Sequence, residues 1–249
     1  MTLTTPSGAR HEIQHHTWNA AGTRGTREIF FAHTQNGRGG RVNLALVLGA
    51  QPDEVNIVEN PVQAGRIALG ARFGANWYFT LHGLSRGGGD SAALLNAIDD
   101  QVDAWAAQAG PNVEYTWTVG GDFNVVPDSL EVRNHFPVAD VIATRPNVPT
   151  HNSGNRYDYF VTTDRTPDLG DAWVDDGPPS DHRPVGLGRM RAAGETDPEV
   201  EPQEDPPSGI RLMPIGDSIT EGYGSSNESG YRDEVQDDIG KITLGHLFG

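Results

Sequence analysis

Histidine and acidic side chains stand at the ends of several apolar segments that are typical of strands. Strand ends lift side chains out of the core into a shared cleft, and two histidines with three aspartates there suit phosphodiester hydrolysis. Carboxylates can hold a divalent cation that polarises a phosphoryl oxygen, while imidazoles transfer protons. An aspartate beside a histidine also fixes the imidazole tautomer. The four motifs are Thr80-Leu81-His82, Gly120-Gly121-Asp122-Phe123-Asn124, Arg156-Tyr157-Asp158-Tyr159 and Ser180-Asp181-His182-Arg183-Pro184-Val185.

The composition restricts which metals such a cleft could bind. The chain of 249 residues contains no cysteine, so a bound metal must use Asp, Glu, Asn and His ligands. Oxygen ligands favour Mg²⁺, with Mn²⁺ and Ca²⁺ as alternatives. The net charge of −16 argues against a general polyanion-binding surface, so any contact with a phosphate must be local. No apolar run reaches the roughly 20 residues of a membrane span, and no signal peptide is visible after Met1.

Strands joined by short loops occupy most of the chain. A glycine-rich turn at 87–91 precedes a predicted helix over 92–107, which carries an apolar stripe. Residues 1–26 are polar and turn-rich, and we expect His15-His16 to lie in a solvated loop. This pattern predicts a largely antiparallel α/β domain. The predicted strands are 28–32, 42–48, 67–73, 77–81, 115–119, 138–143, 157–162 and 184–187.

The chain changes character after residue 189. Residues 190–208 are acidic, rich in proline and nearly free of apolar side chains, so they cannot bury enough surface to offset their ordering entropy. We expect them to form an extended linker. The sequence therefore predicts a first domain over 1–189, a linker over 190–208 and the start of a second domain over 209–249.

Taken in order, the four motifs resemble the endonuclease/exonuclease/phosphatase superfamily, whose type enzyme is deoxyribonuclease I. The resemblance is nearest to the branch that contains the catalytic subunit of cytolethal distending toxin, and it covers residues 15–188. It implies a two-sheet α/β sandwich flanked by helices, a divalent cation, a DNA or other phosphodiester substrate, and export from the cell. Further matching segments are Thr17-Trp18-Asn19, Gly40-Arg41-Val42-Asn43-Leu44, Ala68-Leu69-Gly70-Ala71-Arg72 and Leu81-His82-Gly83-Leu84.

The resemblance also implies a role for each matching residue. His82 and His182 would be the catalytic histidines, and Asp158 would orient His182. Asp122 and Asp181 would contribute to the metal site. Glu28 stands where deoxyribonuclease I has a glutamate that pairs with the first histidine. The residues assigned to the substrate phosphate are Asn124, Arg41 and Arg72.

One part of the superfamily pattern does not match. Its first strand ends in a metal-site Asn, and its second ends in a Gln-Glu pair that supplies a principal metal ligand. No Gln-Glu pair lies upstream of Trp18. We therefore expect a sandwich that is truncated at its N-terminal side, binds a cation weakly and has low activity and stability.

A second motif, Ile215-Gly216-Asp217-Ser218, resembles the first block of the GDSL/SGNH esterases, in which the serine is the nucleophile. The later blocks that would supply a base do not follow it, and without a base Ser218 is an ordinary hydroxyl. We interpret 209–249 as a fragment of such a domain.

Two further functions remain open beside a nuclease and this esterase. One is a phosphomonoesterase, such as a phosphoinositide phosphatase, that uses the same superfamily site. The other is an inactive binding module of the same fold.

Overall fold

The computed structural model describes residues 1–19, 26–34, 42–85, 87–129, 140–142, 148–165, 172–174 and 180–187. The predicted linker, the predicted second-domain fragment with Ser218, and Arg41 all lie outside the described residues.

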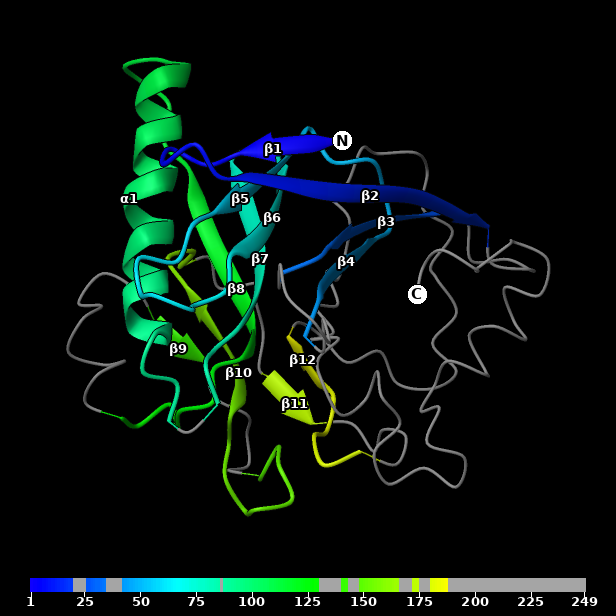
Figure 1. The fold of residues 1–249 in the computed structure, drawn as a ribbon, viewed down its shortest axis with the longest axis vertical. Coiled ribbons are helices and arrows are strands. Elements are labelled where there is room, and N and C mark those ends of the chain that lie inside the picture. The colour runs from blue at the N-terminus through cyan, green and yellow to red at the C-terminus, as the bar shows by residue number, and fades with distance from the viewer. Residues whose placement is uncertain are drawn as a thin grey trace.

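Two β-sheets pack face to face (Figure 1). The first sheet is antiparallel throughout, with the strand order β1-β2-β3-β4. The second has the order β5-β6-β7-β8-β10-β9 and is antiparallel except for the parallel pair β7-β8. A short third sheet pairs β11 with β12. The strands of the first sheet are Thr2–Thr4, Arg10–Asn19, Thr26–Ala32 and Leu44–Leu48. Those of the second, from β5 to β10, are Glu54–Val58, Ala68–Phe73, Asn76–His82, Thr116–Asp122, Asp140–Ile142 and Asp158–Thr162, and β11 and β12 are Ala172–Val174 and Val185–Leu187.

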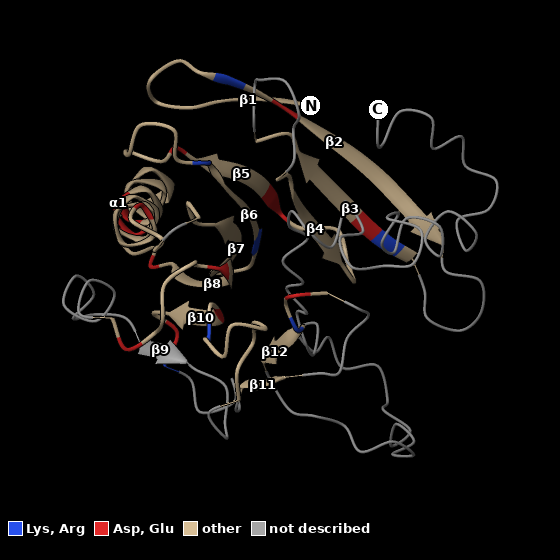
Figure 2. Ribbon diagram, turned by 60° about the horizontal axis from the view of Figure 1, so that its bottom comes forward, with Lys and Arg blue, Asp and Glu red and all other residues tan. Residues whose placement is uncertain are grey.

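Helix α1, Ser91–Ala109, covers the outer face of the six-stranded sheet. Figure 2 shows α1 and the four-stranded sheet on opposite sides of that sheet. This arrangement confirms the predicted two-sheet α/β sandwich. Within the described part of the chain α1 is the only helix, and it is not long and apolar enough to cross a membrane.

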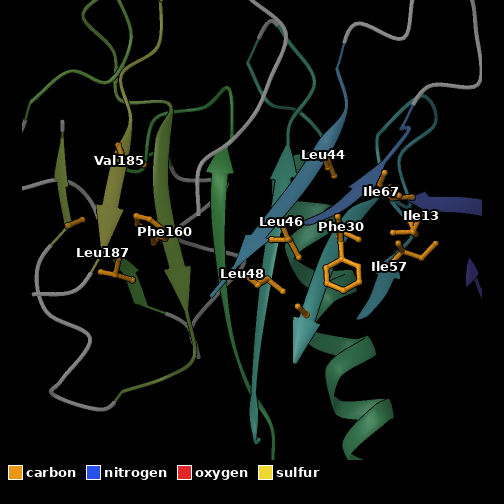
Figure 3. Packing of buried hydrophobic residues seen from close by; sticks show 14 residues of the cluster. Ile13, Phe30, Leu44, Leu46, Leu48, Ile57, Ile67, Phe160, Val185 and Leu187 are labelled. Atoms are coloured by element: carbon orange, nitrogen blue, oxygen red, sulfur yellow. The ribbon is translucent and has the colours of Figure 1, made fainter. Parts of the chain in front are cut away.

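Alternating side chains divide the core into two layers. Trp77, Phe79 and Leu81 of β7 pack against α1, where Trp77 stacks on Trp105 at 4.4 Å between ring centroids. The opposite face of the sheet packs against the four-stranded sheet through a second apolar cluster that includes Phe30 (Figure 3). Because side chains alternate along a strand, His82 shares the inter-sheet face with Thr80 and not the face that carries Leu81.

Asp90 stands at the N-cap of α1 but does not cap the helix. Its fully buried carboxylate accepts hydrogen bonds from the Leu84 backbone N–H at 2.7 Å and from Asn60 Nδ2 at 2.8 Å. These bonds satisfy a buried charge, and they tie the loop that follows His82 to the loop that precedes β6.

The prediction for residues 1–26 was wrong, because β1 and β2 form there. His15 and His16 lie within β2, not in a loop. The His15 ring stacks on Phe30 with 4.3 Å between centroids and 8° between planes, so an imidazole packs on the sheet where an apolar residue would be usual. The strands β5 and β11 were also not predicted, whereas the predicted helix and the other strands occur with shifted ends.

Gly121 allows the backbones of β7 and β8 to approach closely. A Cβ atom at this position would lie 2.2 Å from the Leu81 carbonyl oxygen. We expect Gly121→Ala to lower the free energy of unfolding by about 1–3 kcal/mol, because backbone must move to relieve the overlap. Urea unfolding measures this change.

The matched control is Gly49→Ala, since a Cβ there meets no atom within 4 Å. A Gly121→Ala protein as stable as the Gly49→Ala protein would show that the close approach does not constrain the sheet.

Candidate active site

Three polar side chains form a row across neighbouring strands. His82 ends β7 and is the register partner of Asp122, which ends β8, and Asp122 is also the partner of Asp158, which begins β10. Parallel strands end at the same edge of a sheet, and an antiparallel neighbour begins there. Register partners also project to the same face. The fold therefore brings together residues that are far apart in the sequence, as the motifs predicted.

His182 joins this row from the segment that precedes β12. Its Nδ1 lies 2.9 Å from Asp158 Oδ2 and 3.1 Å from Asp158 Oδ1. Backbone bonds hold the segment in place, with the Arg183 N–H donating to the Thr150 carbonyl at 2.7 Å. Thr150 is itself fully buried, and its Oγ1 accepts the backbone N–H groups of Tyr157 and Asp158. Both partners of the His182–Asp158 pair are thus fixed by the same threonine.

The Asp122 carboxylate lies between the two imidazoles. Its Oδ2 is 3.5 Å from His82 Nε2 and 3.7 Å from His182 Nε2. Asn124, at a positive φ of 52°, donates its backbone N–H to Asp122 Oδ1 and its Nδ2 to Asp122 Oδ2. Nδ2 also donates to the Gly83 carbonyl at 3.1 Å. With the amide nitrogen used by two acceptors, the amide oxygen is the group that Asn124 can offer to a ligand, and an amide oxygen suits a cation better than a phosphate oxygen.

The described residues contain two groups that could hold a metal ion. Asp122, Asp158 and His182 place ligand atoms within 4.8 Å of one another, and so do His151, Asp181 and His182. The predicted metal residues Asp122 and Asp181 thus fall in different groups that share His182. The two buried carboxylates of the first group fit a hard divalent cation, because oxygen ligands are the ones that Mg²⁺ prefers.

Two predicted residues lie elsewhere. Glu28 Oε2 is 2.6 Å from His15 Nε2 and 3.1 Å from Thr17 Oγ1, on the four-stranded sheet. This corrects the expectation that Glu28 pairs with His82.

Arg72 is the next-to-last residue of β6 and the register partner of Trp77. Trp77 stands five positions before His82 along β7, on the face that packs against α1. Its guanidinium lies over the rings of Trp77 and Tyr115 and 3.5 Å from Asp53 and Glu54. The structure therefore does not bring Arg72 to the phosphate site that the resemblance implied.

Two residues near the row were not predicted. Arg66 Nη1 donates to the carbonyl oxygens of His82 and Gly83 at 3.4 and 3.2 Å. His151 lies with its ring edge-on to His182, with 4.6 Å between centroids. Arg66 follows Gly65 in a polar stretch and His151 stands in a turn, so neither carries a motif that the sequence alone could have shown.

Comparison with known proteins decides the family. A profile of the Endonuclease/Exonuclease/phosphatase family matches residues 8–182. The chain belongs to this family.

Relatives within the family are cytolethal distending toxin subunits. A homolog of one such subunit in Salmonella typhi is 32% identical over 169 residues, which are 65% of this chain and 60% of that protein. A cytolethal distending toxin subunit of Escherichia coli is 30% identical over 185 residues, which are 69% and 67% of the two chains. The crystal structure of the Haemophilus ducreyi toxin matches with a TM-score of 0.60 and 30% identity, over 76% of this chain and 80% of that one. The chain thus spans 60% of the length of the Salmonella relative.

In this family member the two histidines have opposite electrostatic character. Burial opposes the cationic form of His182, but the hydrogen bond to Asp158 and the charges of Asp158, Asp122 and Asp181 outweigh it and raise the pKa of His182 to about 9. Burial, the Arg66 charge and the His182 charge lower the pKa of His82 to about 3. Burial and the neighbouring Asp158 also raise the pKa of Asp122 to about 7. At neutral pH the site therefore holds one neutral and one protonated imidazole.

We expect Asp158→Asn to lower the pKa of His182, because the substitution removes both the charge and the strongest acceptor of the imidazolium. Histidine NMR titration measures this change. The pKa of His182 in the folded protein lies above its ordinary value, so the pair stabilises the fold below about pH 6.5 and this contribution is lost as the pH rises through 9. The loss of stability in Asp158→Asn should accordingly be larger at pH 6 than above pH 9.

The matched control is Asp128→Asn, since Asp128 is an exposed aspartate that bonds Arg156 at 2.9 Å. An unchanged His182 titration in Asp158→Asn would contradict the assigned pairing.

Arg66 should help to keep His82 neutral. We expect Arg66→Met to raise the pKa of His82 from about 3 by removing the nearby positive charge, although burial, the larger cause, persists. The same NMR titration reports this shift, and its control is Arg10→Met, at an exposed position that begins β2. A His82 pKa that stays fixed would show that the Arg66 charge does not act on it.

Proposed function

We propose that the chain hydrolyses phosphodiester bonds, with DNA as the substrate class. The observation that carries the proposal is the position of Asp122 Oδ2, which lies between a neutral and a protonated imidazole. A hydrolase that acts on a phosphodiester needs one group beside the attacking water and another beside the leaving oxygen. Two imidazoles whose Nε2 atoms lie 3.5 and 3.7 Å from the same carboxylate oxygen can provide these two positions.

The residues suggest a role for each histidine. His182 Nδ1–H donates to Asp158, which leaves Nε2 directed at the site, and as a cation this imidazole can give a proton to the leaving oxygen. His82 stays neutral, so its Nε2 can accept a hydrogen bond from the attacking water and orient it. Asn124 holds the Asp122 carboxylate between them.

Asp122 and Asp158 would hold a divalent cation, with Mg²⁺ as the preferred ion and Mn²⁺ or Ca²⁺ as alternatives. When bound, the cation would polarise a phosphoryl oxygen and offset the charge that develops on it. Asp181 remains a candidate third carboxylate, because its charge acts on Asp122.

Export from the producing cell is also proposed, because the relatives in Salmonella typhi and Escherichia coli are both named for a toxin. Detection of the protein in cells but never in the culture medium would contradict it.

Removal of either imidazole should abolish most of the activity. We expect His82→Ala and His182→Ala each to reduce Mg²⁺-dependent plasmid nicking by about 10²-fold or more, because each removes a proton-transfer or water-orienting group. A chelator should stop the reaction in the native chain, and added Mg²⁺ should restore it.

The control is His11→Ala, since His11 lies on β2 in the other sheet. Nicking that survives both active-site substitutions would exclude this site as the source of activity. Faster turnover of a small phosphomonoester than of plasmid DNA would instead favour a phosphomonoesterase.

A further inference from the structure

A third imidazole, His151, reaches the site from the segment that precedes β10. Its Nε2 lies 3.6 Å from Asp181 Oδ2, and its ring meets the His182 ring at 68°. An isolated β-bridge joins His151 to His182, and the Asn152 N–H donates to the Asp181 carbonyl at 2.8 Å. The His151 segment and the segment that carries Asp181 and His182 are therefore joined along the backbone as well as through side chains.

The hydrogen bonds around His151 select one tautomer. The Ser153 backbone N–H donates to His151 Nδ1 at 3.0 Å, so this nitrogen must offer its lone pair. Ser153 Oγ lies 2.7 Å from the same Nδ1 and accepts a hydrogen bond from Asn155 Nδ2, which leaves the serine hydroxyl proton free to point at Nδ1. With donors directed at Nδ1, the neutral imidazole carries its proton on Nε2.

This tautomer argues against His151 as a metal ligand, although its Nε2 lies within 4.8 Å of ligand atoms of Asp181 and His182. A nitrogen that carries a proton has no lone pair for a cation. Moving the proton to Nδ1 would bring it against the Ser153 N–H at 3.0 Å. The geometry thus makes Nε2 a donor that faces a carboxylate.

We infer that His151 is a positioning residue: its Nε2–H points at the Asp181 carboxylate at 3.6 Å, and this electrostatic contact places Asp181 and, through it, the adjacent His182. This inference rests on the proposed function, because the two groups that His151 holds are those assigned to the phosphodiester and its cation. Asp158 holds His182 at Nδ1, and the contact of His151 with the neighbouring Asp181 restricts the segment that carries both Asp181 and His182. Partners of this kind orient the groups that touch the substrate.

Two substitutions separate the donor from the ring. His151→Gln places an amide N–H close to the position of Nε2, whereas His151→Phe keeps the ring but has no N–H. In steady-state nicking with Mg²⁺ we expect the Phe variant to lose roughly tenfold in kcat with little change in KM. The Gln variant should retain most of the native rate, with an unchanged Mg²⁺ half-saturation. The matched pair His11→Gln and His11→Phe should leave the rate unaltered.

A measurement that does not depend on activity accompanies the kinetics. Nitrogen-15 NMR of the histidine rings at one fixed pH should show His151 protonated at Nε2. The His182 resonances should move in the Phe variant and remain near their native positions in the Gln variant, while thermal unfolding should show both variants folded.

Three results would overturn the inference. They are equal rates and equal His182 spectra in the two variants, a proton found on His151 Nδ1, or a raised Mg²⁺ requirement in the Gln variant, which would make His151 a ligand. A native chain that cleaves no phosphodiester would refute the proposed function, and the NMR comparison would still decide whether His151 positions His182.

Discussion

The pairing of β8 with two neighbours of opposite direction is the constraint on which the site depends. β7 runs parallel to β8 and ends beside it, while β10 runs antiparallel and begins there, so His82, Asp122 and Asp158 become lateral neighbours. Side chains alternate with a period of two, so a slip of one residue in either pairing would turn the shifted residue toward α1. Gly121 belongs to this constraint, because a side chain there would push β8 away from the Leu81 carbonyl.

Burial of His82, Asp122 and Asp158 shifts the pKa values of His82 and Asp122, and it also costs folding free energy. Asp122 and Asp158 are almost fully buried, at 3% and 1% exposure, and buried carboxylates are tolerated only with hydrogen bonds or opposite charges. Asn124 supplies these hydrogen bonds for the Asp122 carboxylate, and His182 Nδ1 supplies them for the Asp158 carboxylate. The same low exposure keeps His82 neutral beside Arg66. The opposite charge states of the two histidines therefore follow from which partner each imidazole meets.

The sequence predicted the parts of this site that depend on local signals. A histidine or aspartate at the end of an apolar run is visible in the sequence, so His82 and Asp122 were correctly placed at strand ends. A glycine turn before an apolar helical stripe is also visible, so α1 was predicted. Partners chosen by tertiary geometry were not predictable. Glu28 contacts His15 because β2 forms where polar residues suggested a loop. This strand was missed because His15 and Thr17 follow Ile13 on one face, which breaks the apolar alternation that is typical of strands. Arg66 and His151 act through backbone carbonyls and a loop bridge, which leave no trace in residue spacing.

The charges around the row explain why a cation and a phosphodiester would be expected to bind together. The carboxylates of Asp122, Asp158 and Asp181 surround protonated His182, whereas the positive charge of Arg66 acts on His82. Burial, followed by the charges of Asp158 and Asp181, raises the pKa of Asp122 despite the attraction of His182, so the ionised form of this carboxylate is disfavoured in the site. An anionic phosphodiester entering this field adds a further negative charge at short range, where water screens poorly. A divalent cation held by Asp122 and Asp158 would offset this repulsion by supplying local positive charge. The chain carries a net charge of −16, so it offers no broadly basic surface to a polyanion. Binding of a polyanion would therefore depend on positive charge at the site itself.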